Sequence, residues 1–231
     1  MSLSKHTNIG NFLENNSEAV AANTGHIIKK FGKETYGPTL IESDKLKYNE
    51  GAIVDDFFKF WAKYDHIRTG TALIRKNIID KAGFQRADLR ISQDLEYWGY
   101  IATFGKWGFI PKACWVGDPI PVVKNVGWNK KYQKRRRLCP TVEDWERRII
   151  KRLDKNKIAA FKKVRGRVAI GYAHNKILNG SWEEAFELFL KYSVDMPNNK
   201  VFYLMKLCSM MGKWGWYTGC IIFRNREFIK G

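Results

Sequence analysis

Asp94 is the first residue to consider as a catalytic group. It follows the polar pair Ser92-Gln93 and opens an aromatic run in the segment RISQDLEYWGYIATFGKWGFIP (90–111). In the first turn of a helix, a carboxylate is stabilised by the helix dipole by about 0.3–1 kcal/mol. If the same turn faces a cleft, the carboxylate can act as a general base toward a bound hydroxyl group. The neighbouring motifs must decide between these two roles.

Other groups with chemical potential are isolated in the sequence. Asp55-Asp56 stands directly before aromatic residues at helical spacing, which favours a helix cap over a metal site. His66 and His174 have no companion ligands at a metal-binding spacing, so a metal role is disfavoured for both. The four cysteines include no CxxC pair, which predicts free thiols in a reducing cytoplasm rather than a zinc site.

The elements that must position Asp94 alternate between strands and helices as far as about residue 117. The patterns predict a helix ending near residue 18, strands over 19–31, 67–76 and 106–117, a loop over 36–51, and helices over 55–66, 77–84 and 92–105. Helices alone follow, over 141–153, 157–178, 181–197 and 199–212. We therefore expect an α/β fold with an all-helical C-terminal extension. The expected regions are 1–120, a basic loop over 121–140, and 141–231.

Five short motifs in this order give the α/β part a family resemblance. They are Thr69-Gly70-Thr71 at a strand end, Arg75-Lys76, Gly83-Phe84 after a short helix, Gln93-Asp94 at a helix start, and Phe109-Ile110-Pro111. Together they resemble the acceptor-side half of the family 2 glycosyltransferases, which have the GT-A fold. The specific match covers residues 66–112. Residues 9–35 match more loosely, and the C-terminal helices resemble the helical tail of bacterial members.

The resemblance implies roles for individual residues. Asp94 matches the family's catalytic base, which deprotonates the acceptor hydroxyl in an inverting sugar transfer. Thr69, Gly70 and Thr71 match a small-residue patch near the donor sugar. Gln93 stands where the family usually has Glu. Trp98 is a candidate to stack on an acceptor sugar, although core packing is expected for at least one of Tyr97 and Trp98.

The same resemblance implies a missing part. The family's donor half contains an Asp-x-Asp motif that holds a divalent metal, Mg²⁺ or Mn²⁺, and the nucleotide diphosphate, and this sequence has no such motif. We therefore expect a truncated or split enzyme, weakly active or inactive unless a separate donor-binding half completes it. The implied ligands are a nucleotide-sugar donor and a saccharide or lipid-linked acceptor of cell-surface glycan synthesis.

The charge of the chain suggests a further partner. The chain has 231 residues and a net charge of +18, and residues 1–115 contribute 16 basic and 13 acidic side chains, so most of the excess lies in the second half. A cluster without any acid contains Lys124, Lys130, Lys131, Lys134, Arg135, Arg136 and Arg137. It suits an anionic membrane surface, at about 1 kcal/mol per basic side chain. We expect a cytoplasmic protein, peripheral at the inner membrane face.

Two alternatives remain open at this level. The first is a basic nucleic-acid-binding protein, with which the charge and the interleaved aromatic residues are compatible. The second is a non-catalytic glycosyltransferase remnant with an incomplete sheet. That alternative predicts exposed apolar edges on the strands of residues 19–30 and 69–75.

Overall fold

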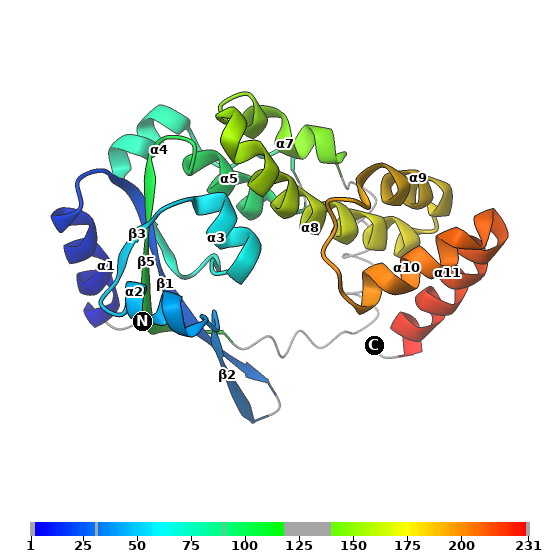
Figure 1. Cartoon of the computed structure of the whole chain (residues 1–231), viewed down its shortest axis with the longest axis horizontal. Coiled ribbons are helices and arrows are strands. Elements are labelled where there is room, and N and C mark those ends of the chain that lie inside the picture. Colours follow the sequence, from blue (N-terminus) through cyan, green and yellow to red (C-terminus); the bar gives the residue numbers. More distant parts are fainter. Residues whose placement is uncertain (1–2, 31, 90, 118–139, 230–231) are drawn as a thin grey trace. The chain divides into compact units, whose positions relative to one another are not determined.

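The computed structural model describes residues 3–30, 32–89, 91–117 and 140–229 (Figure 1). The described residues divide into two compact units. The sheet unit contains those within 1–86, 94–121 and 148–160, and the helical unit contains those within 87–93, 122–147 and 161–231. The units are close to the expected α/β and helical regions, but they interleave along the chain.

The sheet unit consists of helices on both faces of one mixed sheet. Its elements are α1 (Leu3–Asn15), β1 (Ala19–Lys30), β2 (Lys33–Gly37), α2 (Glu42–Tyr48), β3 (Ala52–Val54), α3 (Phe57–Tyr64), β4 (Ala72–Ile74), α4 (Lys76–Ala82), α5 (Gln93–Ile101) and β5 (Lys106–Gly117). Among the described residues, five strands pair in the order β2-β1-β5-β3, and β4 also pairs with β1. Only β1 and β5 are parallel to each other.

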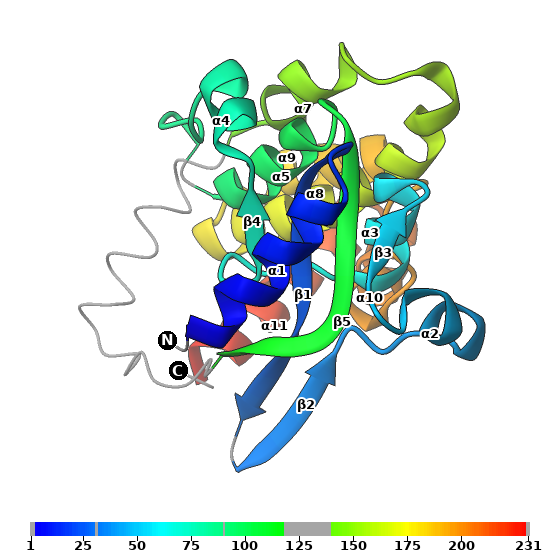
Figure 2. The ribbon, with the colours of Figure 1, turned by 90° about the vertical axis from the view of Figure 1, so that its left-hand side faces the viewer.

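The central pair β1–β5 is long and irregular. Ala22 pairs with Gly108 and His26 with Trp115, with register shifts on either side of Gly25. Extra residues in one strand bend it and increase its twist. Figure 2 shows β5 curving strongly along its length. The bend separates a first part of the sheet (19–24 with 106–110), which is covered by helices, from a second part (25–28 with 113–117) that carries His26 and Trp115.

Each face of the first part of the sheet has its own core. On one face, Ile9 and Leu13 of α1 pack with Ala19, Ala22 and Ile110 of the sheet. On the other face, Phe60 of α3 packs with Tyr48, Val54 and Phe109. Figure 2 shows α1 lying along the sheet, with α2 and α3 beyond β5.

The strand of residues 19–30 has no exposed apolar edge, contrary to the prediction for a remnant. β1 lies inside the sheet, with β5 on one side and β2 and β4 on the other. Its residues Ala19 to Thr24 are buried. The outer strands β3 and β4 have three residues each, and short outer strands are one way in which proteins limit edge-to-edge pairing.

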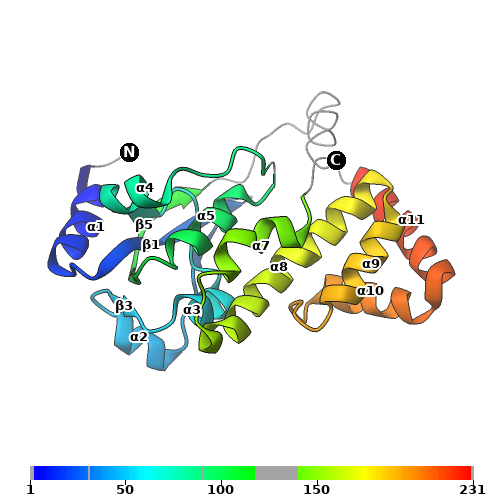
Figure 3. The same cartoon turned by 90° about the horizontal axis from the view of Figure 1, so that it is seen from above.

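The helical unit is built from α7 (Val142–Ile150), α8 (Lys155–Asn179), α9 (Trp182–Tyr192), α10 (Lys200–Met210) and α11 (Gly212–Ile229), of which α7 and α8 begin or end in the sheet unit (Figure 3). Trp145 stacks on Phe161 with ring centroids 5.7 Å apart. The indole of Trp145 also donates to the carbonyl of Ser92, and Tyr172 donates to that of Ile91. These bonds explain why residues 87–93 belong to the helical unit.

The helix signals read from the sequence are mostly confirmed. Asp56 caps α3 by accepting from the Lys59 amide at 3.0 Å, and Thr141 and Asp144 form the expected reciprocal cap of α7. Ser92, the first residue of the predicted helix 92–105, lies outside α5 and has φ 58°, in the left-handed region. The elements β2, α2, β3 and α11 were not predicted, because they are short or lie in segments interpreted as loop or tail.

The chain is therefore a mixed α/β protein with a curled sheet and a helical C-terminal region. Within the part that the structure describes, no helix combines the length and the hydropathy needed to cross a membrane. Cys114, Cys208 and Cys220 form no disulfide.

Candidate functional site at the start of α5

The loop that leads from α3 to β4 is held in place by its own hydrogen bonds. Asp65 ends α3 in the left-handed conformation, and its amide donates to the Trp61 carbonyl. The Arg68 amide donates to Thr71 Oγ1 at 3.0 Å, while the Thr71 hydroxyl donates back to the Arg68 carbonyl at 2.8 Å. The Thr24 amide then ties the Thr71 carbonyl to β1. The loop therefore presents Thr69 at a fixed, exposed tip.

The base of this loop is buried. His66 is fully buried among three aromatic rings, Phe57, Phe60 and Phe109, with centroids 4.6–5.9 Å away. Its carbonyl accepts from the side-chain amide of Asn23 on β1 at 3.1 Å. This environment gives His66 a packing role, as the sequence favoured.

Thr69 and Asp94, far apart in the sequence, meet in the structure. The Thr69 hydroxyl donates to Asp94 Oδ2 at 2.9 Å, and Asp94 Oδ1 accepts from the Leu95 amide at 2.9 Å. A carboxylate has about four lone-pair positions, and these two bonds occupy one on each oxygen. Asp94 is half-buried, so it is oriented and still accessible to another donor.

Trp115 of β5 lies against Gly70, the residue that follows Thr69. A Cβ atom at Gly70 would overlap the indole nitrogen of Trp115, and one at Gly117 would overlap its benzene ring. The two glycines therefore allow the indole to lie close to the backbone of both segments. His26 is next to it on β1, with its ring edge-on to the indole at 6.4 Å. Trp115 is half-buried, whereas His26 is 3% exposed.

Burial and the nearby charges favour the neutral form of His26. Burial lowers the pKa of His26, the nearby Arg68 lowers it further, and Asp65 partly opposes them. Arg68 itself forms an ion pair with Asp65 at 3.2 Å. The second part of the sheet thus offers an uncharged aromatic surface beside Gly70.

The other expected site residues have mixed outcomes. Thr71 is fully buried and bonded to the Arg68 backbone, so its hydroxyl supports the loop. The room beside Gly70 is filled by Trp115. Trp98 is 5% exposed and packs near Trp61, so in this structure it cannot offer a face to a sugar. Gln93 is the half-buried first residue of α5.

Trp115 is the aromatic residue that sequence reasoning missed. It stands near the end of the predicted strand 106–117, with no local feature that sets it apart from a strand residue. Only the close approach at Gly70 and Gly117 reveals its position. The basic cluster of 124–137 lies outside the described residues.

The described residues do not supply a metal site. Within them, no three His, Cys, Asp or Glu side chains converge in a way that could hold an ion. Asp56 is engaged as the cap of α3, and Asp55 forms an ion pair with Lys47. Both also line a cavity of about 280 Å³ that includes Lys106 and Lys157. A divalent metal as implied by the resemblance therefore does not fit the residues present here.

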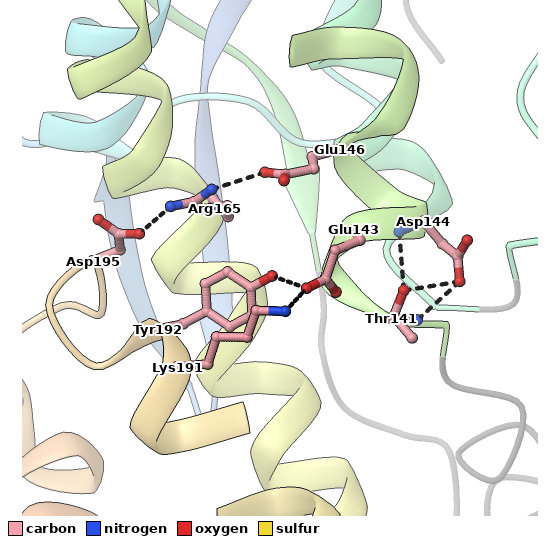
Figure 4. Close-up of polar contacts among 8 residues, drawn as sticks. All are labelled: Thr141, Glu143, Asp144, Glu146, Arg165, Lys191, Tyr192 and Asp195. Atoms are coloured by element: carbon pink, nitrogen blue, oxygen red, sulfur yellow. Dashed lines mark hydrogen bonds and ion pairs between the residues drawn. The ribbon is translucent and has the colours of Figure 1, made fainter. Parts of the chain in front are cut away.

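The helical unit contains a second group of carboxylates, shown in Figure 4. Arg165 of α8 lies between Glu146 of α7 and Asp195 after α9, and it pairs with both. Glu143 accepts from Lys191 and from the Tyr192 hydroxyl, the latter at 2.6 Å. These bonds link three segments of the unit.

The pKa values of this group reflect its partners. For Glu143 burial acts upward, but the hydrogen bonds from Lys191 and Tyr192 dominate and lower the pKa to about 2. For Glu146 burial dominates and raises the pKa, although Arg165 opposes it. Burial and the bond to Glu143 raise the pKa of Tyr192. These carboxylates are committed to protein partners, which is typical of a structural network.

No protein-family model, no curated protein and no solved structure matches this chain. The family resemblance of residues 66–112 therefore rests on the order and spacing of their motifs.

Proposed function

We propose that this chain provides the acceptor side of a GT-A-like sugar transferase, with Asp94 as its catalytic base. One observation carries the proposal, namely the hydrogen bond between Thr69 and Asp94. It joins the small-residue patch and the acidic helix start, the two motifs that the resemblance assigns to one active site. The contact lies on an exposed surface and is oriented by a well-bonded loop.

The geometry suits proton abstraction from an alcohol. As an acceptor hydroxyl oxygen bonds to the anomeric carbon of the donor, its proton passes to a free lone pair of Asp94. The bond from that carbon to the nucleotide diphosphate breaks on the opposite side, so the configuration inverts. Thr69 and the Leu95 amide hold the carboxylate in one orientation throughout.

Trp115 supplies the neighbouring apolar surface. Sugar rings pack on aromatic faces, and the half-buried indole beside Gly70, the residue that follows Thr69, can orient an acceptor without charge. We assign to Trp115 the stacking role that the sequence suggested for Trp98. The small residues Gly70 and Gly117 are what allow the ring to occupy this place.

The partners follow from the chemistry. The donor is a nucleotide sugar, and the acceptor is a saccharide or a lipid-linked glycan of cell-surface glycan synthesis. The leaving diphosphate needs cationic stabilisation, which in this proposal comes from a separate donor-binding half. The basic cluster of 124–137 would face anionic headgroups or the phosphates of a lipid carrier.

The test is sugar transfer by the purified chain, alone and together with candidate donor-half proteins encoded next to it. A panel of radiolabelled nucleotide sugars is offered with membrane-extracted acceptors. Asp94→Asn should lower kcat by about a hundredfold or more, as general-base removal typically does. The matched control is Asp80→Asn, an exposed aspartate of the same unit paired with Lys76.

Three results would count against the proposal. They are unchanged turnover in a folded Asp94→Asn variant, equal losses in Asp94→Asn and Asp80→Asn, and no transfer from any donor of the panel. Binding of DNA or RNA at physiological ionic strength, with a steep salt dependence, would instead support the nucleic-acid alternative.

A further inference from the structure

The hairpin of α10 and α11 exposes far more apolar surface than its core requires. Trp214 is 85% exposed, Met210 75% and Met211 59%, and these residues surround the turn at Gly212. Further exposed apolar residues are Tyr203, Leu204 and Leu207 on α10, and Ile221 and Ile222 on α11. Large contiguous apolar surfaces on a folded protein mark binding sites for other molecules.

The exposed side chains form the outer faces of the two helices. On α10, Phe202, Met205 and Cys208 recur at helical spacing and are buried. The residues between them, including Leu207 and Met210, point away from this inner face. The outer face of a surface helix is ordinarily polar. The outer face of α10 is instead apolar, like its inner face.

The hairpin is well packed, so its apolar exposure is not a sign of a loose tail. Cβ atoms at Gly215 and Gly219 of α11 would overlap Met211 and Cys208, which shows how closely the two helices approach. Trp216 is 1% exposed, and its indole donates to the Trp182 carbonyl at 2.8 Å. Trp214 therefore lies on the outside of the hairpin and Trp216 lies in the core. The sequence did not indicate this difference.

The charge on the hairpin has one sign. From Lys200 to Arg224 the sequence contains basic residues and no acid. Lys200 and Lys206 are exposed beside the apolar residues of α10, and Lys213 next to Trp214 pairs with Glu183 of α9. The acids nearest to the hairpin, Glu183, Glu184 and Glu187, line a pocket with Tyr217 and Trp182. Tyr217 is three residues after Trp214, so these acids lie one helical turn from it on α11, and Glu183 already neutralises Lys213.

We propose that the outer face of the α10–α11 hairpin binds the surface of an anionic lipid bilayer. The apolar tip, formed by Met210, Met211 and Trp214, enters the boundary between headgroups and acyl chains. Lys200 and Lys206, both exposed on α10, contact the negatively charged headgroups. Tryptophan and basic residues around an apolar face are the combination that interfacial helices use.

Charge selects the lipid surface over a second copy of the chain. Two copies meeting face to face would bring Lys200 and Lys206 of both hairpins together, and residues 200–224 contain no acid to neutralise them. An anionic bilayer satisfies both the apolar and the basic side chains. This surface contains no residue of the basic cluster of 124–137, and the inference does not depend on sugar transfer.

The experiment is flotation of the full chain with lipid vesicles. The vesicles contain phosphatidylcholine alone or phosphatidylcholine with about 30% of the anionic lipid phosphatidylglycerol. The chain should float with the anionic vesicles, and raised salt should weaken its binding. The double variant Met210→Ser, Trp214→Ser should bind at least about tenfold more weakly, because each lost apolar contact weakens insertion. The control is Phe84→Ser, which removes an equally exposed aromatic ring (84%) from the sheet unit.

A second measurement locates the inserted residue. Brominated acyl chains should quench part of the tryptophan fluorescence of the wild type, and Trp214→Phe should remove most of that quenching while retaining binding. Circular dichroism should show that all variants fold, since the substituted side chains are exposed.

Several outcomes would overturn the proposal. Equal flotation of the wild type and the double variant would place the membrane contact elsewhere, for example on the cluster of 124–137. Equal loss with Phe84→Ser would reduce the effect to general hydrophobicity. Concentration-dependent dimers in scattering, abolished by Met210→Ser with Trp214→Ser and accompanied by no flotation, would assign the face to a second copy.

Discussion

The carboxylate of Asp94 and the carboxylates of Glu146 and Asp195 are held in opposite ways. Asp94 of the sheet unit has two neutral partners, a hydroxyl and a backbone amide, and is half-buried. Glu146 and Asp195 of the helical unit share one guanidinium and are 9% and 8% exposed. The comparison teaches that burial with a charged partner fixes helices together, whereas partial exposure with neutral partners leaves a carboxylate able to react.

The largest effect should come from Arg165→Met. It leaves Glu146 and Asp195 buried without their cation, a loss that typically costs about 3–5 kcal/mol. The cost should shrink at lower pH, because protonation relieves an unpaired buried carboxylate. Denaturant unfolding at pH 7 and pH 5 measures both values.

The matched control is Arg147→Met on the exposed side of α7. It should change the free energy of unfolding by no more than about 0.5 kcal/mol, as surface substitutions usually do. Similar losses of unfolding free energy for Arg165→Met and Arg147→Met would contradict the special role given to the buried carboxylates.

Gly70→Ala should have the next largest effect, on the Asp94 side of the comparison. The new methyl group overlaps the indole of Trp115, and overpacking of this kind typically costs about 1–3 kcal/mol. In a Trp115→Ala background the same substitution should cost much less. Gly10→Ala, in α1 with open space around it, should be neutral or stabilising. Equal effects at Gly10 and Gly70 would contradict a close approach of the Trp115 indole to Gly70.

The pH dependence of stability should reveal Glu143. Its pKa is about 2 in the folded protein against a usual 4.5, so its stabilisation is complete above pH 4.5 and disappears as the pH falls toward 2. Because the pair is well exposed, Glu143→Gln should cost only about 0.5–1 kcal/mol at pH 6. The difference between variant and wild type should vanish near pH 2. Glu184→Gln, which removes another surface ion pair, serves as the comparison. A difference that grows on acidification would contradict the assignment.

Asp94→Asn should have the smallest effect on folding. The amide keeps an oxygen for the Leu95 amide and remains partly solvated, so the free energy of unfolding should change by about 0.5 kcal/mol or less. Thermal unfolding followed by circular dichroism measures this change. A loss of 2 kcal/mol or more would make Asp94 a structural residue like those of the helical unit.

The sequence predicted the elements with strong local signals. The aromatic spacing of α3, the cap at Asp56 and the reciprocal cap at Thr141 and Asp144 are all present. It also brought Thr69 and Asp94 into one candidate site, and the structure places them in contact. These features depend on residues within one or two turns, or on the order of motifs along the chain.

What the sequence could not show depends on contacts between distant segments. β2 and β3 have only five and three residues, so only their pairing with β1 and β5 makes them strands. Trp98 and Trp115 are both tryptophans near a glycine, and nothing local indicates that Trp98 is buried and Trp115 only half-buried. Arg165 likewise has no partner within a helical turn, because Glu146 and Asp195 come from other segments.

The parallel pairing of β1 and β5 has a consequence for the order of folding. Asn23 and Trp107, which join the two strands through their side chains, are 84 residues apart in the chain. As the chain leaves the ribosome, β1 must wait for most of the sheet unit before its central neighbour exists. Contacts that are so distant in sequence form slowly, whereas the hairpin of α10 and α11 can close as soon as it is synthesised. During that interval β1 exposes little apolar surface in its first half, because three of the residues there are the small alanines Ala19, Ala21 and Ala22.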